Sequence, residues 1–134
     1  MDTTLTTRRE ADMPRLLLRL EGLALFVLAT AAFAHLGLSW WLYAVLFFVP
    51  DLSFAAYTAG PRTGAVFYNA LHSTLGPAIL AGSGWLSESA LCLGLAAIWA
   101  AHIGFDRMLG YGLKYPSGFN DTHLGRIGPK SAGA

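Results

Sequence analysis

Long apolar runs, rather than periodic stripes, dominate this sequence. The runs cover about residues 16–38, 41–59, 64–81 and 87–110. Each is close to the ~20 residues that an α-helix needs to cross the ~30 Å hydrocarbon core of a bilayer. The pattern predicts an all-α protein, a four-helix transmembrane bundle whose helices run up-down-up-down.

The segments between the runs carry turn and interface signals. Trp40 and Trp41 stand where an aromatic belt would meet the head groups, and Gly60-Pro61-Arg62-Thr63 and Gly82-Ser83-Gly84 are typical of turns. Asp12 followed by Pro14 predicts the start of the first helix. The expected organisation is a polar N-terminal segment (1–13), a transmembrane domain (14–110) and a Gly-rich cytoplasmic tail (111–134).

Charge sets the expected orientation. On the four-span layout, the first and third loops carry no basic residue, and all nine lie at the N-terminus, in the second loop, or at the last helix end and tail: Arg8, Arg9, Arg15, Arg19, Arg62, Arg107, Lys114, Arg126 and Lys130. The positive-inside rule therefore predicts that both termini are cytoplasmic, in a multi-pass protein of the inner membrane.

Composition supports a membrane protein and excludes other classes. Hydrophobic residues make up 54% of the chain and charged residues 13%, with a net charge of +1. No basic stripe with interleaved aromatics indicates nucleic-acid binding. The one cysteine, Cys92, rules out an intrachain disulfide or a CxxC metal motif. The expected partners are the lipid bilayer and a second copy of the chain.

A cleaved signal peptide is the competing interpretation of the N-terminus. Basic residues precede the apolar run, and Ala32-Phe33-Ala34 resembles a small-residue cleavage site. However, Glu21 interrupts the run, and cleavage would leave three spans with basic loops on inconsistent sides. The four-span layout is therefore preferred.

One ionisable group on each predicted helix lies at a similar depth. Counted from the cytoplasmic ends, these are Glu21, Asp51, His72 and His102, at about 8–13 Å below the inner surface. Ionisable side chains in a bilayer are costly and often mark a functional site. His35, near the outer end of the first helix, is expected to be interfacial.

Neighbouring residues extend this set. Asn69 lies three residues before His72, and Asp106 four residues after His102, so each pair shares a helix face. Arg107 follows and is expected to pair with a carboxylate or reach the head groups. Pro50 predicts a kink beside Asp51, and Pro77 with Gly76 predicts another in the outer half of the third helix.

Histidines and carboxylates from several helices are the ligands from which metal sites in helical bundles are built. We expect a zinc or iron ion held by His72, His102 and Asp51. In this interpretation Glu21 or Asp106 is a general base or orients a ligand, and Asn69 and Arg107 support the site. A haem between His72 and His102 is a further variant.

Two interpretations without a metal stay open. A hydrogen-bonded polar network would hold the helices together without chemistry. A proton or solute pathway would use Asp51 and Glu21 as proton sites. Depth alone leaves helix rotation open, so the sequence does not decide among these alternatives.

The tail mixes aromatic, acidic and imidazole residues and is long enough to fold back over the cytoplasmic end of the bundle. Asp121 and His123 are then candidates for a base or an extra ligand. An ordered interfacial tail, with its Tyr and Phe side chains at the head groups, is the alternative.

An ordered set of motifs resembles a known family. These are Pro50-Asp51-Leu52, Tyr68-Asn69-Ala70-Leu71-His72, His102-Ile103-Gly104-Phe105-Asp106-Arg107, Gly110-Tyr111-Gly112-Leu113-Lys114 and Thr122-His123-Leu124-Gly125. The chain is similar, over about residues 46–128, to a family of small bacterial four-helix membrane proteins known only as a domain of unknown function. The resemblance implies the membrane fold and brings no activity.

The function expected from the residues is a metal-dependent, membrane-embedded hydrolase that acts on a lipid-like substrate from the cytoplasmic side. In this hypothesis Asp106, Glu21 and His123 are the candidate catalytic residues. The alternative is a non-enzymatic helical membrane protein, either structural and oligomeric or a small proton-coupled carrier.

Overall fold

A computed structural model describes residues 3–128, with side chains from residue 12 onward, and its fold is all-α as predicted. The helices are α1 (Thr3–His35), α2 (Trp40–Leu46), the 3₁₀ helix η1 (Val49–Ala59), α3 (Pro61–His72), α4 (Leu75–Leu86) and α5 (Ala90–Leu109). In the tail, β1 (Asp121–Thr122) pairs antiparallel with β2 (Gly125–Arg126), with Thr122 opposite Gly125. Residues 1–2 of the predicted N-terminal segment and 129–134 of the predicted tail lie outside the described residues.

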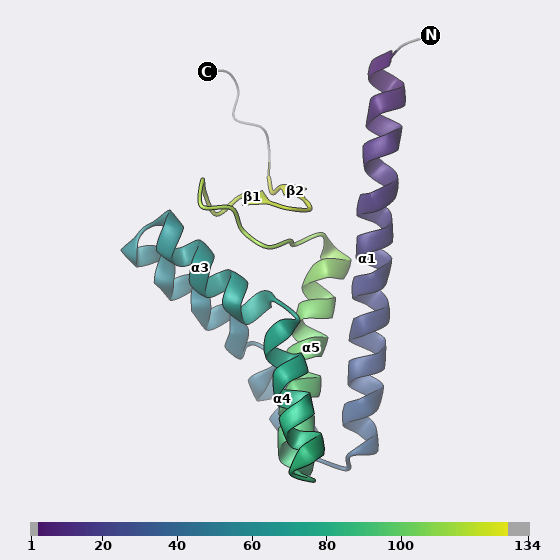
Figure 1. Cartoon of the computed structure of the whole chain (residues 1–134), viewed down its shortest axis with the longest axis vertical. Coiled ribbons are helices and arrows are strands. Elements are labelled where there is room, and N and C mark those ends of the chain that lie inside the picture. Colours follow the sequence, from purple (N-terminus) through teal and green to yellow (C-terminus); the bar gives the residue numbers. More distant parts are fainter. Residues whose placement is uncertain (1–2, 129–134) are drawn as a thin grey trace.

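α1 and α5 form the long axis of the molecule and run antiparallel to each other (Figure 1). Two glycines let their backbones touch. A Cβ on Gly22 would lie 2.4 Å from the Cβ of Arg107, and one on Gly104 would lie 2.5 Å from the backbone nitrogen of Phe26. Small residues at such positions allow close packing of helices in lipid, where dispersion contacts replace the hydrophobic effect as the driving force.

Both middle apolar stretches are broken where a proline forbids a continuous helix. A proline ring collides with the carbonyl four residues earlier, which is that of Leu46 for Pro50 and that of Ser73 for Pro77. α2 ends at Leu46 and η1 begins with Pro50 in its first turn, so the predicted kink beside Asp51 is confirmed. α3 ends at His72 and α4 starts at Leu75, so the predicted stretch 64–81 is divided between two helices.

The carbonyls freed at the end of α3 find donors on α5. Trp99 Nε1 donates to the Leu71 carbonyl (2.6 Å), and Arg107 Nη2 donates to the His72 carbonyl (2.9 Å). The last carbonyls of a helix lack partners within it, and unpaired polar groups in hydrocarbon cost several kcal/mol. These two side chains therefore make the break in the third stretch possible.

The halves on either side of the two breaks point in different directions. η1 and α3 pack side by side as a hairpin that inclines away from α1 and α5, while α4 lies along α5 (Figure 1). The hairpin packs tightly because Gly64 faces the Tyr57 ring, which leaves no room for a Cβ. The breaks and the start of the hairpin thus lie next to α5, where the polar residues gather.

Three helical segments are long and apolar enough to cross a membrane: Asp12–His35, Trp40–Ala59 and Ala90–Leu109. The third predicted stretch is not among them, because α3 and α4 have only 12 residues each. α1 also begins at Thr3, before the predicted start near Asp12, and continues through Pro14. Residues 3–13 contain good helix formers, including Leu, Arg, Glu and Ala, so the helix extends beyond the apolar run.

The close approach of α1 to α5 predicts a glycine-specific loss of stability. Gly104→Ala should lower the thermal unfolding midpoint in detergent, followed by circular dichroism, because the new Cβ would overlap the α1 backbone; overpacking costs about 1–3 kcal/mol. Gly82→Ala in α4 is the matched control, since nothing lies within 4 Å of its added Cβ. Equal midpoints for the two variants would contradict this packing.

Candidate metal centre

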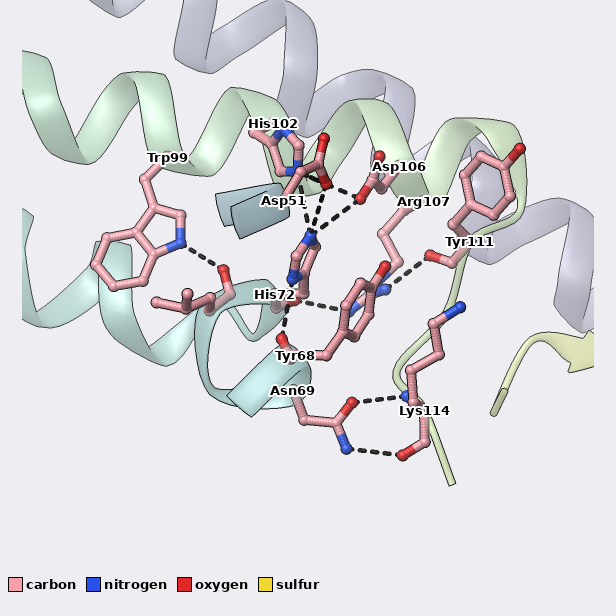
Figure 2. A network of polar contacts seen from close by, with 11 residues as sticks. Asp51, Tyr68, Asn69, His72, Trp99, His102, Asp106, Arg107, Tyr111 and Lys114 are labelled. Carbon is pink, nitrogen blue, oxygen red and sulfur yellow. Dashed lines mark hydrogen bonds and ion pairs between the residues drawn. The ribbon is translucent and has the colours of Figure 1, made fainter. Parts of the chain in front are cut away.

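Four side chains from three helical segments meet at the helix breaks. Asp51 lies in the first turn of η1, His72 is the last residue of α3, and His102 and Asp106 lie one turn apart on α5. One ligand atom from each residue lies within 4.8 Å of the other three. Figure 2 shows the two imidazoles and two carboxylates converging on one point.

Five of the six distances among these four atoms, namely those that involve a histidine, match the spacing of ligands in a tetrahedral metal site. The two histidine Nε2 atoms are 3.1 Å apart. His72 Nε2 lies 3.5 Å from Asp51 Oδ1 and 3.4 Å from Asp106 Oδ2, and the corresponding distances from His102 Nε2 are 3.3 and 3.4 Å. Ligands at about 2.0–2.1 Å around a tetrahedral zinc would be about 3.3–3.4 Å apart.

The hydrogen bonding of His72 directs a lone pair into this centre. Its Nδ1 lies 2.9 Å from the carbonyl oxygen of Tyr68, which only accepts, so Nδ1 carries the proton. In the neutral imidazole, Nε2 is then unprotonated and faces His102 and the two carboxylates. Such a bond to the second ring nitrogen is how ligating histidines are commonly oriented.

When both carboxylates are ionised and His72 is neutral, the four converging atoms offer more hydrogen-bond acceptors than donors. Three of the four are then acceptors, and only His102 Nε2 is able to donate. A bound cation or additional protons must balance them. His102 Nδ1 is buried and has no hydrogen-bond partner among the described residues, and the Phe47 ring packs against this imidazole (centroids 5.2 Å apart).

Burial is uneven across the four ligands. The side chains of His72 and His102 are 0% and 2% exposed, that of Asp106 is 14% exposed and that of Asp51 is 35% exposed. The apolar surroundings strengthen electrostatic interactions at the histidines. The carboxylates form the accessible side of the centre.

A pocket of about 290 Å³ opens on this accessible side. It lies between η1, α3, the end of α5 and the tail, and it is lined by Asp51, Phe54, Tyr68, Asp106, Tyr111, Lys114, Phe119 and Ile127. Both carboxylates of the centre thus face a space with an aromatic rim and one ammonium group. A second pocket, of about 230 Å³, is wholly apolar and lies beside the helix breaks, against Pro50, Leu71 and Trp99.

Sequence reasoning did not assign a site role to Tyr68 or Lys114. The Tyr68 ring stacks on the His72 ring, with centroids 3.8 Å apart and planes at 7°. Lys114 is 3% exposed, and its Nζ lies 3.9 Å from the centroid of the Phe119 ring and 4.9 Å from that of Tyr68. The spacing of four between Tyr68 and His72 placed both on one helix face and was the available signal.

Asn69 and Arg107, the predicted supporting residues, form hydrogen bonds to backbone groups near the centre. Asn69 accepts from the Lys114 N–H (2.6 Å) and donates to the Lys114 carbonyl (2.8 Å), which fastens the tail to α3. Arg107 donates to the carbonyls of His72 and Tyr111 (2.9 and 2.8 Å) rather than to a carboxylate. Both therefore hold elements around the ligands.

The other two candidate catalytic residues lie outside the group of four. Glu21 is exposed on α1, and no contact joins it to the centre. His123 is in the tail, where its Nδ1 accepts from the Leu113 N–H (2.8 Å). Asp106, in contrast, is as close to both histidines as Asp51 is, so the structure places it among the candidate ligands.

A family model described as a domain of unknown function, DUF4260, matches residues 15–127. The chain belongs to the DUF4260 family. The match covers α1 from residue 15 onward, and all but the last residue of the region from 46 to 128 where the motifs pointed to such a family. A search of curated proteins and a search of solved structures each gave no match. Function must therefore be argued from the site.

The clamp made by Asn69 predicts that its loss frees the tail. In Asn69→Leu, the Lys114 N–H and carbonyl lose their partners, at about 0.5–1.5 kcal/mol for each bond, so trypsin should cleave after Lys114 roughly tenfold faster. Limited proteolysis followed by mass spectrometry measures this. Asn120→Leu, an exposed change in the same tail, should cleave like the parent; equal rates for all three proteins would contradict the clamp.

The tail should also loosen in acid. Burial, together with the positive charge of Arg107, lowers the pKa of His123 below its usual 6.5, and a protonated Nδ1 is unable to accept from Leu113. Protons therefore bind the open tail more readily, so protection is complete above about pH 6.5 and falls as pH drops below it. Hydrogen exchange at the Leu113 amide, corrected for intrinsic rates, measures this. His123→Gln should show no such pH dependence, and the same pH-independent protection in both proteins would contradict it.

Proposed function

We propose that this protein is a membrane-embedded, metal-dependent hydrolase that acts on a lipid-like substrate from the cytoplasmic side of the membrane. The observation that carries the proposal is the convergence of two imidazoles and two carboxylates, at tetrahedral spacing, beside an open pocket. Imidazole with carboxylate suits zinc or iron, and the tetrahedral spacing favours zinc.

Hydrolysis is the chemistry that such a centre supplies without another cofactor. A zinc ion held by these residues would lower the pKa of water to about 7. Catalytic zinc sites keep three protein ligands and one open position, so one of the four residues would leave the centre to admit water. Asp51 suits this role because it is the most exposed of the four and begins a 3₁₀ helix beside a break.

The position of the two carboxylates suggests their role in hydrolysis. A carboxylate displaced from the centre stays within hydrogen-bond reach of the incoming water and is placed to take its proton. Water then adds across the ester bond: its OH joins the acyl or phosphoryl group, and its proton reaches the leaving alcohol. Asp51 and Asp106 both line the pocket where that bond would lie.

The surroundings support an amphiphilic substrate. The pocket of about 290 Å³ beside the two carboxylates faces the end of the molecule that carries the tail. The apolar pocket beside Pro50, Leu71 and Trp99 lies next to the helix breaks. The start of α1 and the tail strands lie at one end of the molecule, as the proposed cytoplasmic location of both termini requires (Figure 1). A head group and an apolar chain would each have a place beside the centre.

The four-span topology becomes part of this proposal in modified form. Three of the crossings would be the segments long and apolar enough to span, of which Trp40–Ala59 is itself divided into α2 and η1, and α3 with α4 would make the remaining crossing as a second broken pair. Irregular backbone at membrane depth is tolerated where protein covers it or where it lines a cavity. Trp99 and Arg107 supply that cover for α3.

A proton-coupled carrier is the second candidate, and the paired helix breaks favour it. Transporters often bind substrates where two discontinuous helices break near the same depth. Here both breaks lie at the centre, and protons in place of a metal would balance its lone pairs. Uptake into proteoliposomes that depends on a pH gradient and fails in Asp51→Asn would support the carrier.

Metal content is the first test. Detergent-purified protein should contain nearly one zinc or iron per chain by mass spectrometry, and His72→Ala/His102→Ala should lose it, because each histidine supplies one ligand. His35→Ala, an exposed histidine far along α1 from the centre, should keep it. Metal bound equally by all three proteins, or by none, would contradict the site. Loss of lipid-ester hydrolysis on chelation, restored by zinc, would extend the result to the enzyme.

A further inference from the structure

The Lys114 ammonium is the one charged group of the pocket that the proposed hydrolase does not use. Lys114 is 3% exposed, yet among the residues whose side chains are described no carboxylate lies within 4.0 Å of its Nζ, and Nζ donates no hydrogen bond to any of them. It rests instead on the ring faces of Phe119 and Tyr68. Lysine is rarely buried without an anionic partner, because removing its charge from water is costly.

The position of this ammonium is fixed by the fold. Both backbone polar groups of Lys114 are held by Asn69 on α3, and Lys114 also forms a β-bridge with Thr122. The next residue, Tyr115, donates its N–H to the Asp121 carbonyl (2.7 Å). The tail therefore carries Lys114 into the pocket wall, beside Tyr68 (Figure 2).

Tyr68 joins this ammonium to the metal centre. The Tyr68 ring stacks on the His72 imidazole, with centroids 3.8 Å apart, and the Lys114 Nζ lies 4.9 Å from the centroid of the same Tyr68 ring. Asp106 and Asp51 line the same pocket. Once a divalent ion is present, its open coordination position and the ammonium are two points of one small space that an anion could contact, here called the two poles.

The charge balance of the loaded pocket favours an anion. A divalent ion is neutralised by the carboxylates of Asp51 and Asp106, which leaves the Lys114 charge uncompensated. Arg107 adds a second positive charge, although its guanidinium is engaged by the carbonyls of His72 and Tyr111. A pocket of about 290 Å³ has room for a small oxyanion with part of its alcohol, and a tetrahedral oxyanion presents oxygens to both poles at once.

We propose that Lys114 and the metal centre together bind a phosphate group, so that the substrates of this site are phosphate esters. This inference rests on the proposed function and specifies its substrate class. Lysine is a common phosphate ligand that acts as a point charge, and positive groups around a transferring phosphoryl stabilise its charge. Water would add to phosphorus, the P–O bond to the alcohol would break, and the alcohol would take the proton.

Binding of inorganic phosphate to the metal-loaded, detergent-purified chain tests the proposal by isothermal titration calorimetry. Lys114→Met keeps the apolar stem and removes the charge, so it should weaken phosphate binding at least roughly tenfold while metal content and thermal midpoint stay unchanged. Lys114→Arg should retain most of the affinity. Arg62→Met, in the first turn of α3, is the matched loss of one positive charge and should bind like the parent.

Competing anions test the specificity of the site and identify the source of the phosphate group. Acetate should bind more weakly than phosphate, because it spans the two poles less well. Displacement of bound phosphate by nanodiscs of phosphatidylcholine with phosphatidic acid, and not by phosphatidylcholine alone, would identify a lipid head group. Displacement by glycerol 3-phosphate without an effect of either nanodisc would identify a soluble ester. Either result supports the phosphate site.

Two results would overturn the phosphate site, and a third would overturn the proposed hydrolase. Equal phosphate affinity in Lys114→Met and the parent, with metal intact in both, would make Lys114 structural and leave the metal centre standing. A metal-loaded parent that binds no phosphate would also overturn it. If the purified chain holds no metal, the proposed hydrolase fails on that measurement alone. The same Lys114→Met comparison without metal then decides whether the anion site survives.

Discussion

The last carbonyls of a buried helix need donors from elsewhere in the fold, and the structure around the centre depends on that constraint. Pro77 prevents α3 from continuing, and α5 supplies the indole of Trp99 and the guanidinium of Arg107 to the carbonyls left free. The same contacts fix the end of α3 against α5. His72, as the last residue of α3, is thereby held opposite His102.

The polar network therefore has two layers with different tasks. The outer layer pairs backbone groups: Asn69 fastens the tail, and Arg107 joins α3 to the loop after α5. The inner layer consists of His72, His102 and the two aspartates, whose side-chain nitrogen and oxygen atoms converge on one point. Because the outer layer satisfies the backbone, the inner layer stays free to hold a cation.

Much of this arrangement was predictable from local sequence signals. The apolar runs indicated the all-α fold, the spacing of His102 and Asp106 placed them on one face, and Pro50 located the break beside Asp51. Depth counting chose three of the four converging residues. It failed to place Glu21 because depth does not fix the rotation of a helix, and Gly22 turns the neighbouring face of α1 towards α5 instead.

The features that escaped prediction are those that tertiary contacts decide. The division of the third stretch depends on donors from α5, far away in sequence. The burial of Lys114 depends on Asn69, 45 residues earlier. The positive-inside prediction counted Lys114 as one of nine basic residues on the cytoplasmic side, whereas in the fold Lys114 is buried.

The attachment of the tail to α3 also sets an order of events during synthesis. The tail follows every candidate membrane-spanning segment in the chain, so the helices that carry the four converging residues are synthesised before Lys114. Until Asn69 holds the tail, the accessible side of the centre lacks the wall that Lys114 and Phe119 provide. The pocket is therefore completed last, by the segment that Asn69 fastens to α3.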